Sequence, residues 1–127
     1  MNRKAISTDK APAAVGPYSQ AVLVDGWLYM SGQLGIEPGT GEFVEGGVQA
    51  ETKQIFRNLA AVLEAAGGKL GDITATRVYL ADMADFAVMN EVYKENFGDA
   101  TPARECVQVA ALPKGGRVEI SAVARIS

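Results

Sequence analysis

The spacing of apolar residues changes along this chain, and each change marks a predicted element. Residues 21–24 and 27–33 are two runs rich in β-forming side chains, separated by Asp25-Gly26. An Asp-Gly pair between such runs favours a type I′ turn, so the two runs are predicted to form a β-hairpin. The stretch from 35 to 47 is rich in glycine and is predicted to be a loop.

From Val48 onward the apolar residues recur every three or four positions, which is typical of a helix with one buried face. Gly67-Gly68 is predicted to end this helix, because glycine readily adopts the left-handed conformation found at helix C-termini. Residues 73–81 are rich in β-branched side chains and are predicted to form a strand. The helix is expected to bury Val48, Ile55, Phe56, Leu59, Val62 and Leu63.

A second helix is predicted after residue 81. Asp82 or Asp85 can cap its N-terminus, and Gly98 is expected to end it. Its apolar stripe is interpreted as core packing alone and consists of Phe86, Met89, Tyr93 and Phe97.

Two further strands are predicted over residues 104–112 and 117–126, with the turn-forming stretch 113–116 between them. If this stretch makes a simple hairpin, Leu112 lies opposite Arg117 and the apolar residues of both strands share the face under the helices. The element order is then β-β-α-β-α-β-β, an α+β fold with one mixed sheet and two helices on one face. The apolar rows are Val107, Val109, Ala111, Val118, Ile120, Ala122 and Ala124.

The opposite face of these strands is too polar for a core but less polar than an ordinary wet surface. A sheet with helices on one side can cover its second face by self-association, so a homo-oligomer is expected. In this register Glu119 lies opposite Ala110, and Arg104 and Glu119 are about 20 Å apart on the same face. A site that uses both must then lie between subunits. The polar residues of this face are Arg104, Cys106, Gln108, Glu119, Ser121 and Arg125.

Composition narrows the chemistry further. The chain has 127 residues, which suits a single domain over 1–127, and its 12 basic and 15 acidic residues give a net charge of −3. It has no histidine and a single cysteine, Cys106, which excludes histidine-based catalytic triads, imidazole or thiolate metal sites and internal disulfides. Catalysis is expected to use the remaining polar side chains and backbone groups, without metal or other cofactor.

The sequence also predicts where the protein is located and which two kinds of partner it lacks. No Lys/Arg-rich stretch resembles a phosphate-binding surface, so no nucleic-acid partner is expected. No apolar run approaches the ~20 residues that span a bilayer, so no membrane partner is expected. Residues 1–4 lead into a polar segment without the apolar part of a signal peptide, and the protein is predicted to be cytosolic.

Several short motifs follow one another in a fixed order from about residue 11 to residue 124. They are Gly16-Pro17-Tyr18-Ser19-Gln20-Ala21, Ser31-Gly32-Gln33, Asp82-Met83-Ala84-Asp85-Phe86 with Asn90, Pro102-Ala103-Arg104-Glu105-Cys106-Val107, Leu112-Pro113-Lys114 and Val118-Glu119-Ile120. Each motif alone is weak, but the ordered set is specific. It resembles the RidA family of reactive intermediate deaminases, also called the YjgF family.

The resemblance implies a chorismate-mutase-like α+β fold and a homotrimer with ligand sites between subunits. It also implies cofactor-free hydrolysis of imines and enamines, such as 2-iminobutanoate, 2-iminopropanoate and 2-aminoacrylate, to 2-keto acids and ammonia. The ligand would be a small anionic imino or keto acid. In the family, the position of Arg104 holds the substrate carboxylate, and the pocket is lined by the positions of Tyr18, Ser31, Gly32, Asn90, Cys106 and Glu119.

This chain departs from the family pattern at two positions. Glu105 stands where many relatives have serine, and Ser121 stands where a second glutamate is common. Because neighbouring strand residues point to opposite faces, Glu105 is expected to point away from Arg104 and to affect binding little.

Arg104 and Glu119 have the chemistry that the implied reaction needs. A guanidinium binds a carboxylate through two parallel charge-assisted hydrogen bonds. The alternative for Arg104 is a surface arginine or a structural ion pair with an Asp or Glu. Glu119 is the candidate to position or activate the attacking water, because a chain without histidine has a carboxylate as its available general base. The alternative for Glu119 is an exposed strand glutamate.

The other candidates each have a structural alternative. Tyr18 either closes the pocket or serves as an interface aromatic, and Ser31-Gly32 either allows close approach of a ligand or ends a strand. Asn90 either makes a polar contact across a subunit boundary or is a solvated helix position. Cys106 is interpreted as a pocket wall or a plain buried cysteine rather than a nucleophile, because the reaction needs no covalent intermediate.

Two other functions stay open at this point. The same cleft could bind keto acids or amino acids without turnover. RNA cleavage or translation inhibition has been attached to the family and is ranked last, because the chain has a net charge of −3, no histidine and no basic tract.

Overall fold

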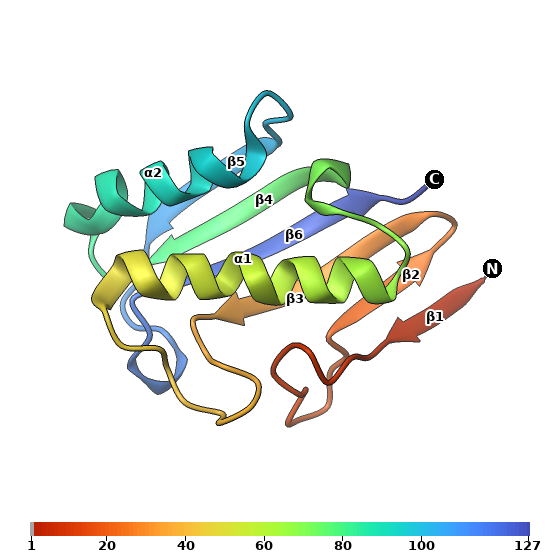
Figure 1. The fold of residues 1–127 in the computed structure, drawn as a ribbon, viewed down its shortest axis with the longest axis horizontal. Helices are drawn as coiled ribbons and strands as arrows, with labels where there is room; N and C mark the ends of the chain where they lie inside the picture. The colour runs from red at the N-terminus through yellow and green to blue at the C-terminus, as the bar shows by residue number, and fades with distance from the viewer. Residues whose placement is uncertain (1) are drawn as a thin grey trace.

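A computed structural model describes residues 2–127 as a six-stranded sheet with two long helices (Figure 1). The helices are α1 (Gly47–Ala65) and α2 (Phe86–Phe97). Three short 3₁₀ turns, η1, η2 and η3, cover Leu70–Asp72, Met83–Asp85 and Pro113–Gly115. The strands are β1 (Arg3–Ile6), β2 (Ala21–Val24), β3 (Trp27–Leu34), β4 (Ile73–Leu80), β5 (Ala103–Gln108) and β6 (Val118–Arg125).

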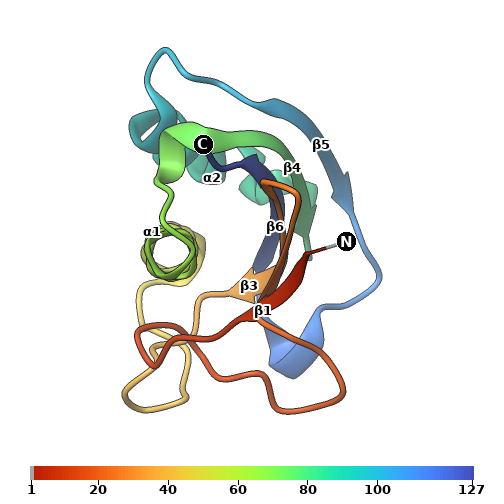
Figure 2. The same cartoon turned by 90° about the vertical axis from the view of Figure 1, so that its right-hand side faces the viewer.

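The sheet is mixed, with the strand order β1-β2-β3-β6-β4-β5. All neighbouring strands are antiparallel except β4 and β5, which are parallel and are connected through α2. Figure 2 shows both helices on one side of the curved sheet, and neither long helix of residues 2–127 covers the other side. The predicted α+β class, with one mixed sheet and two helices on one face, is confirmed.

The local signals of the sequence are confirmed at the first hairpin and at the end of α1. Asp25 and Gly26 both have positive φ, 50° and 84°, as a type I′ turn requires. The N–H of Gly68 donates to the carbonyl of Leu63 at 2.8 Å, and the N–H of Gly67 donates to that of Glu64 at 3.0 Å. These two bonds form a Schellman motif, which satisfies carbonyls at the helix C-terminus.

The helix caps and the first strand add detail that the sequence pattern did not settle. Asp82 accepts a hydrogen bond from the N–H of Ala84 and caps η2, whereas Asp85 makes no side-chain cap bond to α2. Strand β1 was not predicted, because its four residues, three of them exposed, show no clear alternation. It adds an edge strand beside β2, so the element order gains one strand at its start.

The predicted hairpin between the last two strands is wrong. Strand β6 lies between β3 and β4, and β5 lies at the sheet edge, paired only with β4. Leu112 is therefore not opposite Arg117, and Glu119 pairs with Leu34 and Tyr79 instead of Ala110. In the central position β6 is hydrogen-bonded to a strand on each side, and its apolar row lies in the middle of the buried face. Beside β5, at the sheet edge, that row would be buried less completely.

The predicted faces are right for β6 and wrong for β5. The row of Val118, Ile120, Ala122 and Ala124 is buried under the helices as expected. The parallel register pairs Thr76 with Arg104 and Val78 with Cys106, and Thr76 and Val78 are buried beneath the helices. Arg104 and Cys106 therefore lie on the helix side, and Val107, which was expected in the core, is 48% exposed.

It follows that Arg104 and Glu119 lie on opposite faces of the sheet, not on one face as predicted. Glu105 points away from Arg104, as expected, and lies with Arg77 and Ser121 on the open face.

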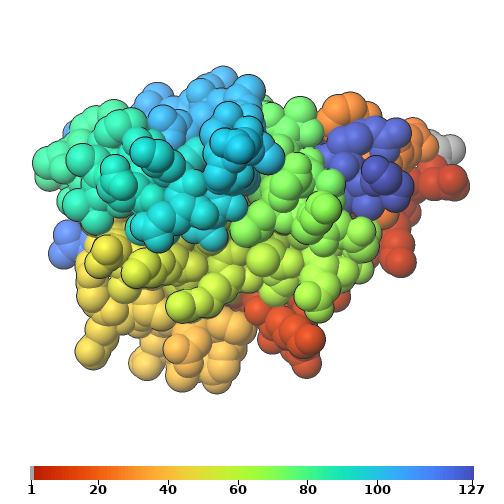
Figure 3. All heavy atoms as spheres, turned by 45° about the horizontal axis from the view of Figure 1, so that its top comes forward, coloured from red at the N-terminus to blue at the C-terminus, as the bar shows by residue number. Residues whose placement is uncertain are grey.

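The helix side of the sheet is covered. Figure 3 shows the side chains of α1 and α2 as one continuous layer. Every residue of the apolar stripe predicted for α1 is buried there. No helix among residues 2–127 combines the length and apolarity needed to cross a membrane.

Candidate functional site

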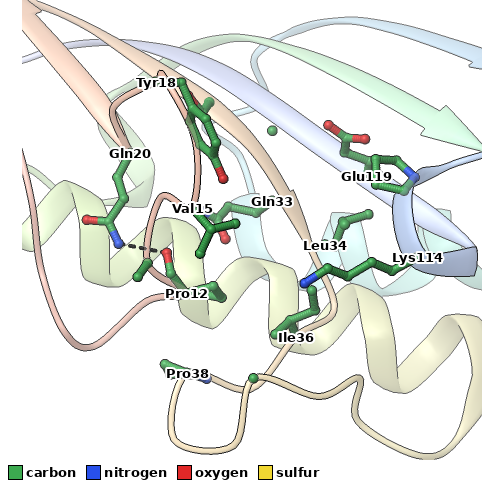
Figure 4. A pocket seen from close by; sticks show the side chains of 15 residues that line it. Pro12, Val15, Tyr18, Gln20, Gln33, Leu34, Ile36, Pro38, Lys114 and Glu119 are labelled. Atoms are coloured by element: carbon green, nitrogen blue, oxygen red, sulfur yellow. Dashed lines mark hydrogen bonds between the residues drawn. The ribbon is translucent and has the colours of Figure 1, made fainter.

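A cavity of about 630 Å³ opens where β3 ends and β6 begins, and four of the predicted site residues line it. Its walls come from the loop that contains Pro12, Val15 and Tyr18, from the end of β3, and from η3 with Lys114. Figure 4 shows Tyr18 of the loop, Lys114 of η3 and Glu119 of β6 directed into the cavity. The predicted residues in its wall are Tyr18, Ser31, Gly32 and Glu119.

Glu119 reaches the cavity because of an irregularity in β3. The register between β3 and β6 shifts between Met30 and Gln33, where Ser31 and Gly32 lie. A Cβ at Gly32 would collide with the carboxylate of Glu119, so a larger residue at this position would displace that side chain. Burial raises the pKa of the Glu119 carboxyl above its ordinary value. A higher pKa makes the carboxylate a better proton acceptor near neutral pH.

The loop that carries Tyr18 is held by Gln20, which the sequence did not identify as important for the site. The Gln20 amide accepts from the N–H of Thr8 at 2.7 Å and donates to the carbonyls of Thr8, Ala11 and Pro12. The bond to Pro12 is visible in Figure 4. Tyr18 itself is 53% exposed at the cavity rim.

Ser31 has a structural bond inside the same wall. Its hydroxyl donates to the carbonyl of Ser19 at 2.6 Å, and its N–H donates to the carbonyl of Gln20 at 3.0 Å. The side chain thus joins the bulged part of β3 to the loop with Tyr18. Its hydroxyl oxygen can still accept one hydrogen bond from a ligand.

Lys114 is a second cavity residue, which the sequence indicates only as part of the Leu-Pro-Lys motif. It adopts a left-handed conformation with φ 57° inside η3. A non-glycine residue in this region is uncommon and costs conformational free energy. The signal that could have pointed to it is its place between Pro113 and Gly115 in the Leu-Pro-Lys motif.

The remaining predicted site residues form a separate cluster where α2 meets β5. Arg104 donates from Nη1 to Oδ1 of Asn90 at 2.7 Å. The Arg104 guanidinium carbon lies 4.6 Å from the ring centroid of Tyr93 and 5.4 Å from that of Phe86. Within residues 2–127 no Asp or Glu forms an ion pair with Arg104, so the guanidinium keeps free donors for an anion.

Tyr93 therefore does more than pack in the core, which corrects the interpretation of its stripe. Its hydroxyl and that of Thr76 are 2.7 Å apart, and its ring lies beneath the guanidinium of Arg104. Burial is the main cause that raises the pKa of the Tyr93 hydroxyl. The Thr76 bond fixes the ring, and the ring supports the planar cation above it.

Cys106 packs against the core beside this cluster and is half-buried. Burial raises the pKa of its thiol, and the nearby Arg104 opposes that rise less strongly. The neutral thiol is thereby favoured over the nucleophilic thiolate. This fits the interpretation of Cys106 as a wall residue.

A single chain does not bring all predicted site residues together. It joins Tyr18, Ser31, Gly32 and Glu119 in the cavity and, separately, the cluster of Asn90, Arg104 and Cys106, none of which lines that cavity. The described part of the chain, residues 2–127, also holds no group of three or more Cys, Asp or Glu side chains arranged for a metal ion.

Comparisons with known proteins cover nearly the whole chain. The profile of the family described as Endoribonuclease L-PSP matches residues 8–126. The 2-iminobutanoate/2-iminopropanoate deaminase of Bos taurus is 57% identical over 122 residues, which make up 96% of this chain and 89% of that protein. The Homo sapiens protein of the same name is 54% identical, with the same coverage.

Two solved structures have the same fold. RidA from the Antarctic bacterium Psychrobacter sp. superimposes with a TM-score of 0.93 at 54% identity, covering 97% of this chain and 99% of its own. E. coli TdcF with bound serine gives 0.92 at 42% identity, covering 98% and 99%. The profile match, the identities and the shared fold establish that this chain belongs to the RidA (YjgF) family.

Proposed function

We propose that this protein hydrolyses small 2-imino and 2-enamino acids to 2-keto acids and ammonia, without a cofactor. The substrates are 2-iminobutanoate, 2-iminopropanoate and 2-aminoacrylate. Relatives named for the first two substrates are 54–57% identical over nearly the whole chain. The observation that supports this activity most directly concerns the guanidinium of Arg104. Asn90 and the ring of Tyr93 hold it in place, and among residues 2–127 no carboxylate neutralises it.

Arg104 would bind the α-carboxylate of the substrate. One edge of its guanidinium is engaged by Asn90, and the other donors can form two parallel bonds to a carboxylate. The rings of Phe86 and Tyr93 limit its motion, so less conformational entropy is lost when the anion binds. Cys106, two residues further along β5, would provide a wall beside the ligand.

Glu119 would position and deprotonate the attacking water. An enamine first takes a proton on carbon to become the imine, and water then adds to C2 of the protonated imine. The water gives up a proton to Glu119, and the C–N bond breaks after the nitrogen has been protonated. Ammonia leaves with the electron pair of the C–N bond, and the hydroxyl oxygen releases its proton to the solvent as it becomes the carbonyl of the 2-keto acid.

These two groups would meet between subunits of a homotrimer. Arg104 and Glu119 lie on opposite faces of the sheet in one chain, so one small ligand reaches both only if neighbouring chains contribute one each. The helix-free face of the sheet offers a surface for association, with Tyr29 52% and Val107 48% exposed. Tyr18, at the cavity rim, would then close the pocket at the subunit boundary.

The test is hydrolysis of 2-iminobutanoate that is generated in situ from threonine by a pyridoxal-phosphate dehydratase. The protein is expected to release 2-ketobutanoate and ammonia faster than the spontaneous reaction, and Arg104→Ala is expected to abolish this gain. Arg57→Ala, which removes an exposed arginine on α1, is the matched control and should keep full activity. Full activity in Arg104→Ala would refute the assignment.

The second candidate is binding of a small carboxylate without turnover. A related structure, that of TdcF, holds serine, which favours a pocket able to bind amino acids. Ligand binding with keto-acid release at only the spontaneous rate would favour this candidate. RNA cleavage, which the family description names, ranks last because the chain has a net charge of −3 and no histidine. A cytosolic location and the lack of nucleic-acid or membrane partners stay predictions.

A further inference from the structure

Glu51 is a buried carboxylate that the proposed reaction does not use. It lies on the first turns of α1 and is only 6% exposed. Its Oε1 accepts a hydrogen bond from the N–H of Arg117 at 2.9 Å, and its Oε2 lies 3.9 Å from Nε of the same residue. A carboxylate is costly to bury unless its oxygens are bonded, so the contact with Arg117 is the feature to explain.

The backbone bond to Arg117 replaces a missing strand neighbour. Arg117 immediately precedes β6, and the ladder between β3 and β6 ends at the pair Leu34 and Glu119. The carbonyl of Arg117 accepts from the N–H of Ala81, just beyond β4. The start of β6 is thus held by β4 on one side and by the side chain of Glu51 on the other.

Glu51 also fixes the distance between α1 and the end of β3. A Cβ at Gly35 would lie 2.6 Å from the Cα of Glu51, so the helix backbone approaches the strand end closely at this point. Gly32 and Glu119, which meet at the acidic end of the cavity, lie on the same two strands, within three residues of Gly35 and Arg117. Glu51 is therefore bonded to the start of β6 and packed against the end of β3, next to the residues that place the Glu119 carboxylate.

We propose that Glu51 is a positioning residue for Glu119, acting through its hydrogen bond to the backbone N–H of Arg117. The inference rests on the proposed function, in which Glu119 directs the water and Arg104 binds the substrate. Loss of the bond would let the start of β6 move and would misplace Glu119. Because Arg104 belongs to a separate cluster, substrate binding would change little, and the loss would appear in kcat rather than in KM.

The experiment compares five variants in the 2-iminobutanoate assay. Glu51→Asp keeps the charge but falls one methylene short of the Arg117 N–H, and Glu51→Ala removes the acceptor. Both are expected to lower kcat by about 10- to 100-fold with KM nearly unchanged. Glu51→Gln keeps an amide oxygen for the N–H and is expected to restore kcat to within about twofold of the wild type.

Two controls separate the backbone bond from other effects. Arg117→Met removes the guanidinium but keeps the N–H, so kcat should stay at the wild-type value. Glu64→Ala removes an acid of the same helix whose side chain is 78% exposed, and it should also be neutral. Glu51→Asp provides the result if Glu51→Ala does not fold.

The proposal is overturned if Glu51→Asp keeps the wild-type kcat. It is also overturned if Glu51→Gln is as impaired as Glu51→Asp, or if the defect appears in KM alone. A wild-type protein without imine hydrolysis would instead refute the proposed function itself. The two failures are thus distinguishable in one assay.

Discussion

Mixing two inactive variants tests whether one site takes its residues from two chains. Arg104→Ala removes the carboxylate anchor, and Glu119→Gln removes the base. Loss of two charge-assisted hydrogen bonds at Arg104, worth about 1.5–3 kcal/mol each, is expected to lower kcat/KM by at least about 100-fold. These residues lie on opposite faces of the sheet. In the proposed intersubunit site, each variant would therefore still contribute one intact half to a neighbour.

The expected recovery follows from the ring symmetry of the proposed homotrimer. A complete site needs Arg104 from a Glu119→Gln chain and Glu119 from an adjacent Arg104→Ala chain. With equal amounts and random assembly, about one site in four meets this condition, so activity should return to about a quarter of the wild type. The assay is 2-ketobutanoate release after co-refolding of the two variants, against each variant refolded alone.

A second mixture serves as the control. Asn90 and Arg104 are joined by a 2.7 Å hydrogen bond in one chain, so they belong to the same half-site. Neither Asn90→Ala nor Arg104→Ala keeps this half-site intact, so their mixture can assemble no complete site. No gain above the average of the two separate activities is therefore expected. Absence of recovery in the first mixture, with mixed oligomers shown by mass spectrometry, would refute the intersubunit site.

Three further changes test the geometry described above. Gly32→Ala places a Cβ against the Glu119 carboxylate and is expected to lower kcat by about 10- to 100-fold in the same assay; an unchanged kcat would contradict the close approach. The raised pKa of Glu119 means that this group costs folding free energy as pH rises from about 4.5 through its folded value. Glu119→Gln should therefore have a higher Tm than the wild type at about pH 8 and an equal Tm at about pH 4, and equal Tm values at both pH values would refute that reasoning. Tyr93→Phe leaves the buried hydroxyl of Thr76 unpaired and is expected to lower the free energy of unfolding by about 1–3 kcal/mol in urea denaturation, whereas no loss would show that the 2.7 Å contact is not stabilising.

Local structure was well predicted because local residues control it. The Asp25-Gly26 turn needs two residues that tolerate positive φ, and the cap of α1 needs one such residue, Gly67. The apolar stripe of α1 predicted its buried face because a helix places every third or fourth residue on one side. These features depend on a few residues that are close together in the chain, so they can be predicted from one sequence.

The pairing of the last two strands was mispredicted because strands that follow one another need not be neighbours. Alternation in residues 104–112 shows that two faces differ, but it does not show which face meets the helices. The parallel register with β4 decides this, since it sets Arg104 beside Thr76 and Cys106 beside Val78. Strand β5 is an edge strand, so its apolar Val107 can be left exposed on the open face.

The sequence alone determined the α+β class, the two helices, the family resemblance and the residue types available for chemistry. Only the tertiary structure decided that β6 separates β3 from β4, that Arg104 and Glu119 lie on opposite faces, and that Gln20 and Lys114 line the cavity. The physical reason is range. Turns, caps and helix faces arise from interactions between residues close in sequence, whereas the order of strands depends on contacts between segments that lie far apart along the chain.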